Sequence, residues 1–272
     1  MTDRVSLPDA ASGAGALDVA WRCAREAGAL ALSHFRSAHD ISSKGHRNVV
    51  TETDVACELL IKRILADEYP AHAILSEETA SDADASSGWA WVVDPIDGTK
   101  NYSIGLPFWC VNIALCHDGD PVLGITYDPN HDEGFWAVAG EGAFLNERRM
   151  AASASPDVFS SVLGLDLGYD DVLGSCQLRL LSRIFPEVQG LRITGSAALG
   201  LAYAACGRID LYIHLSVSPW DIAPGILLIH EAGGLTTEPS GAPMRIMSRQ
   251  FVAGGHRVHA DFMARYAGEG WG

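Results

Sequence analysis

Apolar residues recur at helical spacing over residues 17–35, and this pattern predicts a first helix with one apolar face. A second amphipathic pattern over residues 53–68 predicts another helix, which ends before Pro70. The segment between the two predicted helices is polar and contains Lys44. Asp54 therefore falls at the start of the second predicted helix.

Short apolar runs separated by turn residues fill the middle of the chain, which is typical of a sheet built largely from sequential strands. The predicted strands cover residues 73–75, 89–93, 108–115, 122–127 and 134–139. The middle of the chain is therefore expected to be rich in β-structure.

Helical patterns alternate with short strands in the rest of the chain, and this alternation predicts an α/β arrangement. The helical patterns cover residues 172–184, 196–206, 221–232 and 256–266, and the strands cover residues 162–165, 211–214 and 251–253. We therefore expect one compact unit with an N-terminal α+β half, residues 1–150, and a C-terminal α/β half, residues 151–272. The expected boundary is the small-residue segment 151–156.

Composition restricts the function further. The chain has 272 residues, 48% of them hydrophobic, which is enough to bury a sizeable core. Its formal charge of -15, from 34 acidic and 19 basic residues, would repel a polyanion, so we expect no nucleic-acid partner. An enzyme this acidic could bind a phosphate ester if divalent cations reversed the local sign of the charge.

The chain shows no signal for secretion or for membrane insertion. Residues 1–17 lack the basic start and apolar run of a signal peptide, and no later stretch is long enough to span a bilayer. The six cysteines have neither metal-ligand spacing nor the density of a disulfide scaffold. We therefore expect a cytoplasmic protein with reduced thiols and no membrane partner.

The most informative segment begins as an apolar strand and ends in two aspartates, Asp94 and Asp97, separated by a proline and an isoleucine. Because Pro95 restricts the turn, both carboxylates can be held toward one cavity. Carboxylates, a backbone carbonyl such as that of Ile96, and phosphate oxygens are the ligands that Mg²⁺ prefers. Gly98, followed by a helix start at Thr99, would offer free amides to a phosphate.

Three more acids lie at the ends of predicted elements. Asp54 opens a helix, Glu77 follows a strand, and Asp221 opens the helix that ends near Glu231. Each one alone is explained as a helix cap, a dipole partner or a solvated acid. Together with Asp94 and Asp97 they become candidate metal ligands and catalytic groups.

These motifs, in this order, resemble the inositol monophosphatase family. The resemblance rests on Asp94-Pro-Ile-Asp97-Gly-Thr99, Trp220-Asp221-Ile-Ala and Glu231-Ala-Gly-Gly, and it extends to Thr51-Glu-Thr-Asp54, Glu77-Glu78 and Gly195-Ser196-Ala197. It spans about residues 16–257 and implies a layered αβαβα sandwich. It also implies a homodimer, inhibition by lithium, and magnesium-dependent hydrolysis of a phosphate monoester.

The resemblance further implies a ligand set for two metal ions. Glu77, Asp94 and the carbonyl of Ile96 would bind one Mg²⁺, and Asp94, Asp97 and Asp221 would bind a second. A third, looser ion is expected near Glu77. Lys44 stands where the family often has a basic residue near the phosphate and the third ion.

The catalytic and substrate-binding roles come from the same resemblance. Thr99 would position the attacking water and Asp54 would accept its proton, with Glu77 serving catalysis through the metal, so that no phosphoenzyme forms. Substrate contacts are expected from Asp97, Gly98, Thr99, Gly195, Ser196, Ala197, His214 and Asp221.

The substrate itself stays open, because His214 occupies a position where relatives often have a glutamate that contacts substrate hydroxyls. A neutral histidine can donate as well as accept a hydrogen bond, so recognition of an inositol ring is in question. Myo-inositol monophosphate is the first candidate, and histidinol phosphate, fructose 1,6-bisphosphate and, less favoured, a 3'-nucleotide are the alternatives. A regulatory protein-interaction role is the alternative from another class.

Overall fold

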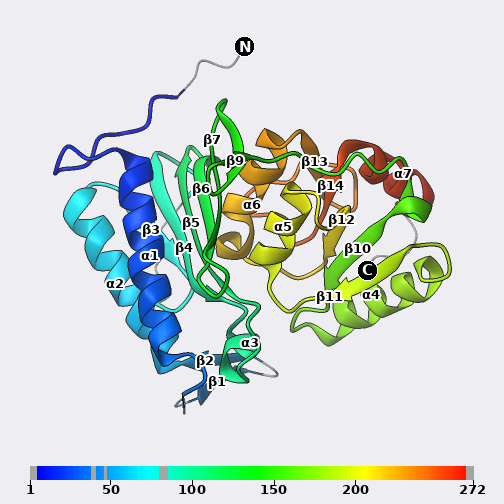
Figure 1. Cartoon of the computed structure of the whole chain (residues 1–272), viewed down its shortest axis with the longest axis horizontal. Coiled ribbons are helices and arrows are strands. Elements are labelled where there is room, and N and C mark those ends of the chain that lie inside the picture. Colours follow the sequence, from blue (N-terminus) through cyan, green and yellow to red (C-terminus); the bar gives the residue numbers. More distant parts are fainter. Residues whose placement is uncertain (1–4, 38–40, 46–47, 80–84, 268–272) are drawn as a thin grey trace.

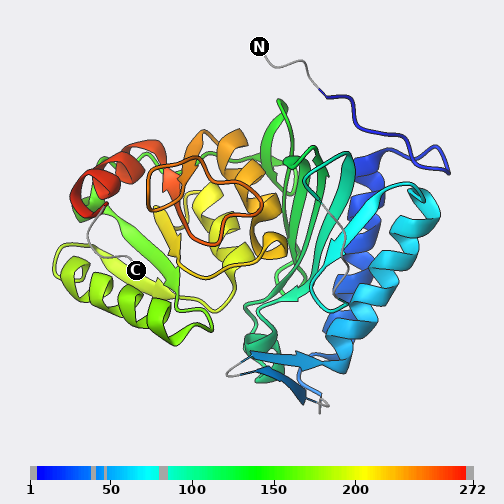
Figure 2. The same ribbon diagram turned by 180° about the vertical axis from the view of Figure 1, so that it is seen from behind.

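The structure, a computed structural model, describes residues 5–37, 41–45, 48–79 and 85–267. It consists of five layers in which helices and sheets alternate (Figures 1 and 2). The outer helices α1 (Ala16–His34) and α2 (Glu52–Glu68) cover one face of a seven-stranded sheet. The inner helices α5 (Ala197–Ala205) and α6 (Pro219–Glu231) separate this sheet from a five-stranded sheet. The outer helices α4 (Asp171–Ile184) and α7 (His256–Tyr266) complete the predicted αβαβα sandwich, which is confirmed.

The seven-stranded sheet follows the order of the chain, as predicted. Its strands are β3 (Ala73–Ser76), β4 (Trp89–Asp97), β5 (Cys110–His117), β6 (Asp120–Asp128), β7 (Glu133–Val138), β8 (Gly142–Leu145) and β9 (Arg148–Arg149). β3 and β4 are parallel, and every later neighbour is antiparallel. The sequence did not predict β8 and β9, because strands of four and two residues are too short for an alternating pattern.

Both faces of this sheet are buried, because apolar side chains on β4 alternate between two cores. Trp91 and Val93 pack in the cluster formed with α1 and α2, whereas Ala90 and Val92 pack in the cluster formed with α5 and α6. The bulky residues face the outer helices. A continuous apolar run therefore produces a central strand whose end carries Asp94 and Asp97 to the edge of the layer.

The five-stranded sheet has the order β11-β10-β12-β14-β13. Its strands are β10 (Val162–Asp166), β11 (Gly190–Ile193), β12 (Leu211–His214), β13 (Gly234–Thr237) and β14 (Phe251–Gly255). β10 runs parallel to β11 and β12, while β14 is antiparallel to β12 and β13. The two strands that the sequence did not predict, β11 and β13, are the edge strands of this sheet, and each carries few buried apolar residues.

Smaller elements complete the described fold. β1 (Ile41–Gly45) and β2 (Asn48–Thr51) pair as an antiparallel hairpin where the sequence showed only a polar segment. α3 (Thr99–Ser103) follows the Asp-Gly-Thr motif, and a short 3₁₀ helix covers Val158–Ser160. Within the described residues, no helix is both long and apolar enough to cross a membrane, and the six cysteines are free thiols.

Candidate active site

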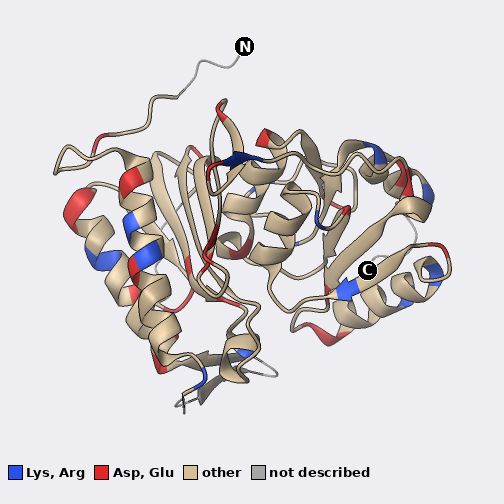
Figure 3. Ribbon diagram, viewed as in Figure 1, with Lys and Arg blue, Asp and Glu red and all other residues tan. Residues whose placement is uncertain are grey.

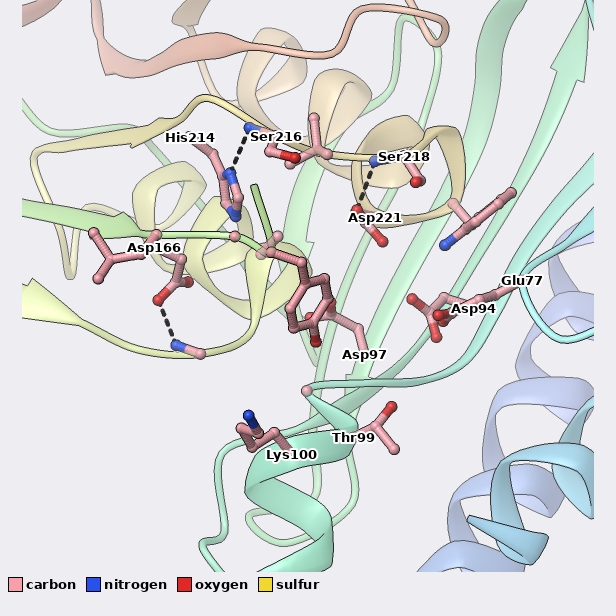
Figure 4. A pocket seen from close by; sticks show the side chains of 18 of the residues that line it. Glu77, Asp94, Asp97, Thr99, Lys100, Asp166, His214, Ser216, Ser218 and Asp221 are labelled. Atoms are coloured by element: carbon pink, nitrogen blue, oxygen red, sulfur yellow. Dashed lines mark hydrogen bonds between the residues drawn. The ribbon is translucent and has the colours of Figure 1, made fainter. Parts of the chain in front are cut away.

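A cavity of about 400 Å³ opens where the end of β4 meets the start of α6 and the ends of β10 and β12 (Figure 4). Most of the predicted site residues line this cavity, namely Glu77, Asp94, Ile96, Asp97, Gly98, Thr99, Gly195, Ala197, His214 and Asp221. Asp54 and Ser196 are buried and do not line it. The side chain of Lys44 lies outside the described residues, so its predicted role stays a prediction.

Three aspartates from distant parts of the chain form a cluster in the cavity. Asp94 and Asp97 lie at the irregular end of β4, and Asp221 lies in the first turn of α6. One oxygen from each carboxylate lies within 4.8 Å of those of the other two. Within the part of the chain that the structure describes, no lysine or arginine pairs with any of the three.

The backbone fixes each of these carboxylates. The amide of Ile96 donates to Asp94 at 3.1 Å, and the amide of Ser218 donates to Asp221 at 2.7 Å. Asp97 accepts from the amide of Ala198 at 3.0 Å, at the start of α5. The cluster is therefore held in place before any ligand binds.

Burial makes this cluster electrostatically costly. It raises the pKa of Asp94 and of Asp221 well above the usual range, and repulsion from Glu77 and the other aspartates adds to the shift. Burial also raises the pKa of Asp97 to about 7, although hydrogen bonds from Ser196 and Ala198 oppose the shift. Several buried carboxylates can ionise together only beside a compensating positive charge. A donor set made of oxygens alone fits a hard divalent cation.

Glu77 extends the cluster from the end of β3, and Figure 4 shows its side chain beside Asp94. It lines the cavity and is half-buried. The four acidic side chains thus converge from three separate elements, as the sequence predicted from their positions at element ends.

Thr99 connects the cavity to a buried carboxylate behind it. Its hydroxyl lies 2.9 Å from Asp54 and 3.0 Å from the carbonyl oxygen of Ile96. Asp54 also accepts hydrogen bonds from the amide of Thr51, at 2.9 Å, and from the Thr51 hydroxyl. These bonds belong to a capping box at the start of α2. Burial nevertheless raises the pKa of Asp54 to about 6. Asp54 is therefore suited to accept a proton near neutral pH.

Gly98 makes the turn before Thr99 possible. Its φ is 94°, in the region that favours glycine, and an added Cβ would lie 3.0 Å from the carbonyl oxygen of Phe108. A side chain at this position would be strained and would crowd the Phe108 carbonyl and the loop at Gly195 and Ser196.

Glu58 is a supporting residue that the sequence analysis missed. It lies one helical turn after Asp54 on α2 and is fully buried. Its carboxylate accepts the amide of Glu78 at 2.6 Å and the amide of Thr79 at 2.9 Å. One face of α2 thus holds Thr99 through Asp54 and the backbone after Glu77 through Glu58. In the sequence, the available signal was a second acid four residues after Asp54, on the same face of the predicted amphipathic helix.

Glu58→Gln should weaken Mg²⁺ binding, because an amide has one acceptor oxygen and one of the two backbone donors would lose its partner. Loss of a hydrogen bond that orients a metal ligand typically costs about 10- to 100-fold in metal affinity, so we expect a loss of about tenfold with turnover largely retained at saturating Mg²⁺. Calorimetric titration of the protein with Mg²⁺ measures this. Glu26→Gln, an exposed exchange on α1, is the matched control. Unchanged Mg²⁺ affinity in the Glu58 variant would show that Glu58 does not position Glu77.

Asp166 supports the opposite side of the site and was also missed. It lies at the end of β10 and accepts hydrogen bonds from the amides of Thr194 and Gly195, from the Thr194 hydroxyl, and from the Tyr212 hydroxyl. These bonds fix the loop before α5. That loop places the Ser196 hydroxyl on Asp97. Ser196 was predicted to contact substrate, and its buried position instead favours support of Asp97.

The fold and this carboxylate-lined cavity place the protein in the class of metal-dependent phosphatases. The comparison with protein families is more specific, because the model of the inositol monophosphatase family matches residues 16–271. The chain therefore belongs to the inositol monophosphatase family and is a phosphoric monoester hydrolase.

Individual relatives agree with this assignment. The chain is 37% identical over 244 residues to inositol monophosphatase 2 of Solanum lycopersicum, which covers 87% of this chain and 92% of the relative. It is 34% identical over 256 residues to the Nus factor SuhB of Escherichia coli K12, covering 93% and 96% of the two chains. The structure of the IMPase of Thermotoga maritima superimposes with a TM-score of 0.86 at 29% identity, covering 94% and 99% of the two chains.

Proposed function

We propose that this protein hydrolyses a small phosphate monoester with Mg²⁺, without a phosphoenzyme, and that myo-inositol monophosphate is the first candidate substrate. The observation that carries the proposal is the cluster of buried Asp94 and Asp97 with half-buried Asp221, next to the Thr99–Asp54 pair. The cavity has the size of a small-metabolite site. The name of the tomato relative supports the inositol ester.

Residues of this chain would bind the metal ions, position the attacking water, accept its proton and bind the phosphate. Glu77, Asp94 and the Ile96 carbonyl would hold one Mg²⁺, and Asp94, Asp97 and Asp221 a second, with a third ion near Glu77. Bound in this way, the metal would polarise the phosphoryl group and lower the pKa of a water molecule. Because the Thr99 hydroxyl donates to Asp54, its oxygen can accept a hydrogen bond from water in the cavity and orient it. Asp54 would take up proton density through Thr99, and the amides of Gly98 and Thr99 would bind phosphate oxygens.

Further parts of the proposal rest on family membership and on the composition and pattern of the sequence. We propose a cytoplasmic homodimer that lithium inhibits and that binds neither nucleic acid nor membrane. We also propose that residues 1–150 and 151–272 act as two halves of one unit. Analytical ultracentrifugation tests the dimer, and an inhibition curve with LiCl tests the lithium effect.

Phosphate release from a panel of esters tests the activity. The panel contains myo-inositol 1-phosphate, histidinol phosphate, fructose 1,6-bisphosphate and a 3'-nucleotide, each with Mg²⁺ and with EDTA. Mg²⁺-dependent turnover supports the proposal, and the preferred ester identifies the substrate. No release from any ester would favour a regulatory role, for which the similarity to a Nus factor is the present support.

Mg²⁺ should stabilise the folded protein more strongly at about pH 7.5 than at about pH 5. Burial raises the pKa of Asp97 from 3.8 to about 7, so between these values the metal-free folded state keeps protons that the unfolded chain has released. The free energy of unfolding of the metal-free protein therefore falls as pH rises through this window. Mg²⁺ replaces these protons, so its stabilising effect should grow with pH. Melting temperatures in Mg²⁺ and in EDTA measure the difference, and equal differences at both pH values would contradict metal binding here.

A further inference from the structure

The cavity wall away from the acidic cluster carries hydrogen-bond donors. Figure 4 shows His214 on the side of the cavity opposite Glu77 and Asp94, and Lys100 near its lower edge. Arg249 also lines the cavity. These three residues, which we call the donor wall, come from the end of β12, from α3 and from the segment before β14.

The proton on His214 is placed by the backbone. The amide of Ser216 donates to Nδ1 of His214 at 3.0 Å, so Nδ1 must be the unprotonated nitrogen. Burial lowers the pKa of His214 to about 4, which keeps the ring neutral at working pH. The proton of a neutral ring is then on Nε2. His214 thus acts as a fixed donor, and the substrate atom that meets it must be an acceptor.

Two cationic side chains reinforce this preference. Lys100 and Arg249 are exposed at the cavity, and among the described residues no carboxylate pairs with either. Among the described residues, four other arginines do pair with carboxylates, namely Arg22, Arg208, Arg245 and Arg265. The amide of Val217 donates to the carbonyl of Arg249 at 3.0 Å, which ties Arg249 to the segment after His214.

The carboxylate of Asp166 lies nearby, but hydrogen bonds already stabilise its charge. It accepts from two amides and two hydroxyls, and only 6% of the residue is exposed. Stabilised in this way, Asp166 opposes an incoming anion less than a free carboxylate would. The three side chains of the donor wall itself present only donors to the cavity.

We propose that the donor wall is a subsite for a second anionic group on the alcohol part of the substrate, either a carboxylate or a second phosphate. The inference rests on the proposed function and refines it. Esters with such a group are preferred over myo-inositol monophosphate, whose ring offers only neutral hydroxyls to this wall.

Matched pairs of esters test the subsite. 3-Phosphoglycerate differs from glycerol 1-phosphate by a carboxylate, and fructose 1,6-bisphosphate differs from fructose 1-phosphate by a second phosphate. We expect the anionic member of at least one pair to have a kcat/KM higher by about tenfold or more, the effect of one charge-assisted hydrogen bond. The pair that shows the preference identifies the group.

Variants connect the preference to the wall. Arg249→Ala should lower the kcat/KM of the anionic ester by about tenfold and leave that of its neutral partner unchanged. His214→Glu, which replaces a donor with a charged acceptor, should reverse the preference. Arg257→Ala, an exposed exchange on α7 that does not line the cavity, is the matched control.

The outcomes separate this proposal from the one on which it rests. Equal kcat/KM within both pairs, with Mg²⁺-dependent turnover intact, would overturn the subsite and leave the phosphatase activity standing. A preference that persists in Arg249→Ala would also overturn it, whatever happens to the folding of the buried His214 variant. No turnover of any ester, including myo-inositol 1-phosphate, would overturn the proposed function itself.

Discussion

Asp94→Asn is expected to abolish catalysis and, at the same time, to raise the melting temperature of the metal-free protein. Asp94 is buried among like charges, and repulsion from Glu77, Asp97 and Asp221 adds to the cost of its ionisation. Asparagine keeps the acceptor for the Ile96 amide but removes one of these charges. The metal-free folded state should therefore gain stability while the site loses a shared metal ligand.

The expected loss in kcat/KM is at least about a thousandfold, because metal-ion catalysis contributes several kcal/mol of transition-state stabilisation. Phosphate release at saturating Mg²⁺ measures the activity, and thermal unfolding in EDTA measures the stability. Asp67→Asn, an exposed exchange near the end of α2, should change neither quantity. An Asp94 variant that stays active, or one that unfolds at a lower temperature without metal, would contradict a cation site at this cluster.

Figure 3 shows why the acidic balance alone does not locate this site. Acidic residues are spread over helices, loops and strand ends throughout the molecule, and basic residues are interspersed among them. What distinguishes Asp94, Asp97 and Asp221 is that their carboxylates converge within 4.8 Å of one another, with no lysine or arginine paired to them among the described residues. The acidic net charge predicted a need for a metal ion. Only the positions of the acids at the ends of predicted helices and strands indicated where that ion would bind.

The sequence predicted well those features that depend on neighbouring residues. The apolar run before Asp94 and the helix starts at Asp54 and Asp221 are local patterns, and each forms as expected. The turn predicted at Pro95 is wrong, because Pro95 lies within β4, where pairing with β5 is irregular, and the chain turns only at Gly98. The sheet order followed because consecutive strands of the first sheet are neighbours. The layered αβαβα arrangement was predicted from the family resemblance.

The missed features depend on contacts between distant residues. Glu58 binds backbone amides about twenty residues away, at Glu78 and Thr79, and Asp166 binds the loop at Thr194. The sequence does not indicate which backbone amide will donate a hydrogen bond to a buried carboxylate. Of the predicted substrate contacts Gly195, Ser196 and Ala197, only Ser196 does not line the cavity, and the fold directs its hydroxyl to Asp97.

Thr99→Val is expected to reduce kcat by about a hundredfold or more, the usual range for loss of a positioned proton acceptor. Valine has nearly the shape of threonine but cannot connect cavity water to Asp54, so the defect should lie in kcat, while Mg²⁺ affinity changes by less than about twofold. This separates Thr99→Val from Asp94→Asn, in which metal binding itself should fail. Thr99→Ser keeps the hydroxyl and is the matched control.

The pH profile of the residual activity gives a sharper test. The hydrogen bond from Thr99 favours the ionised form of Asp54 and so lowers its pKa, which burial has raised to about 6. Without the hydroxyl, this pKa should rise further, and the acid limb of the kcat profile should move to higher pH in Thr99→Val but not in Thr99→Ser. A profile that stays in place in the valine variant would mean that Asp54 only caps α2. A shift in the expected direction would assign the acid limb to Asp54 and make the Thr99–Asp54 pair part of the proton path.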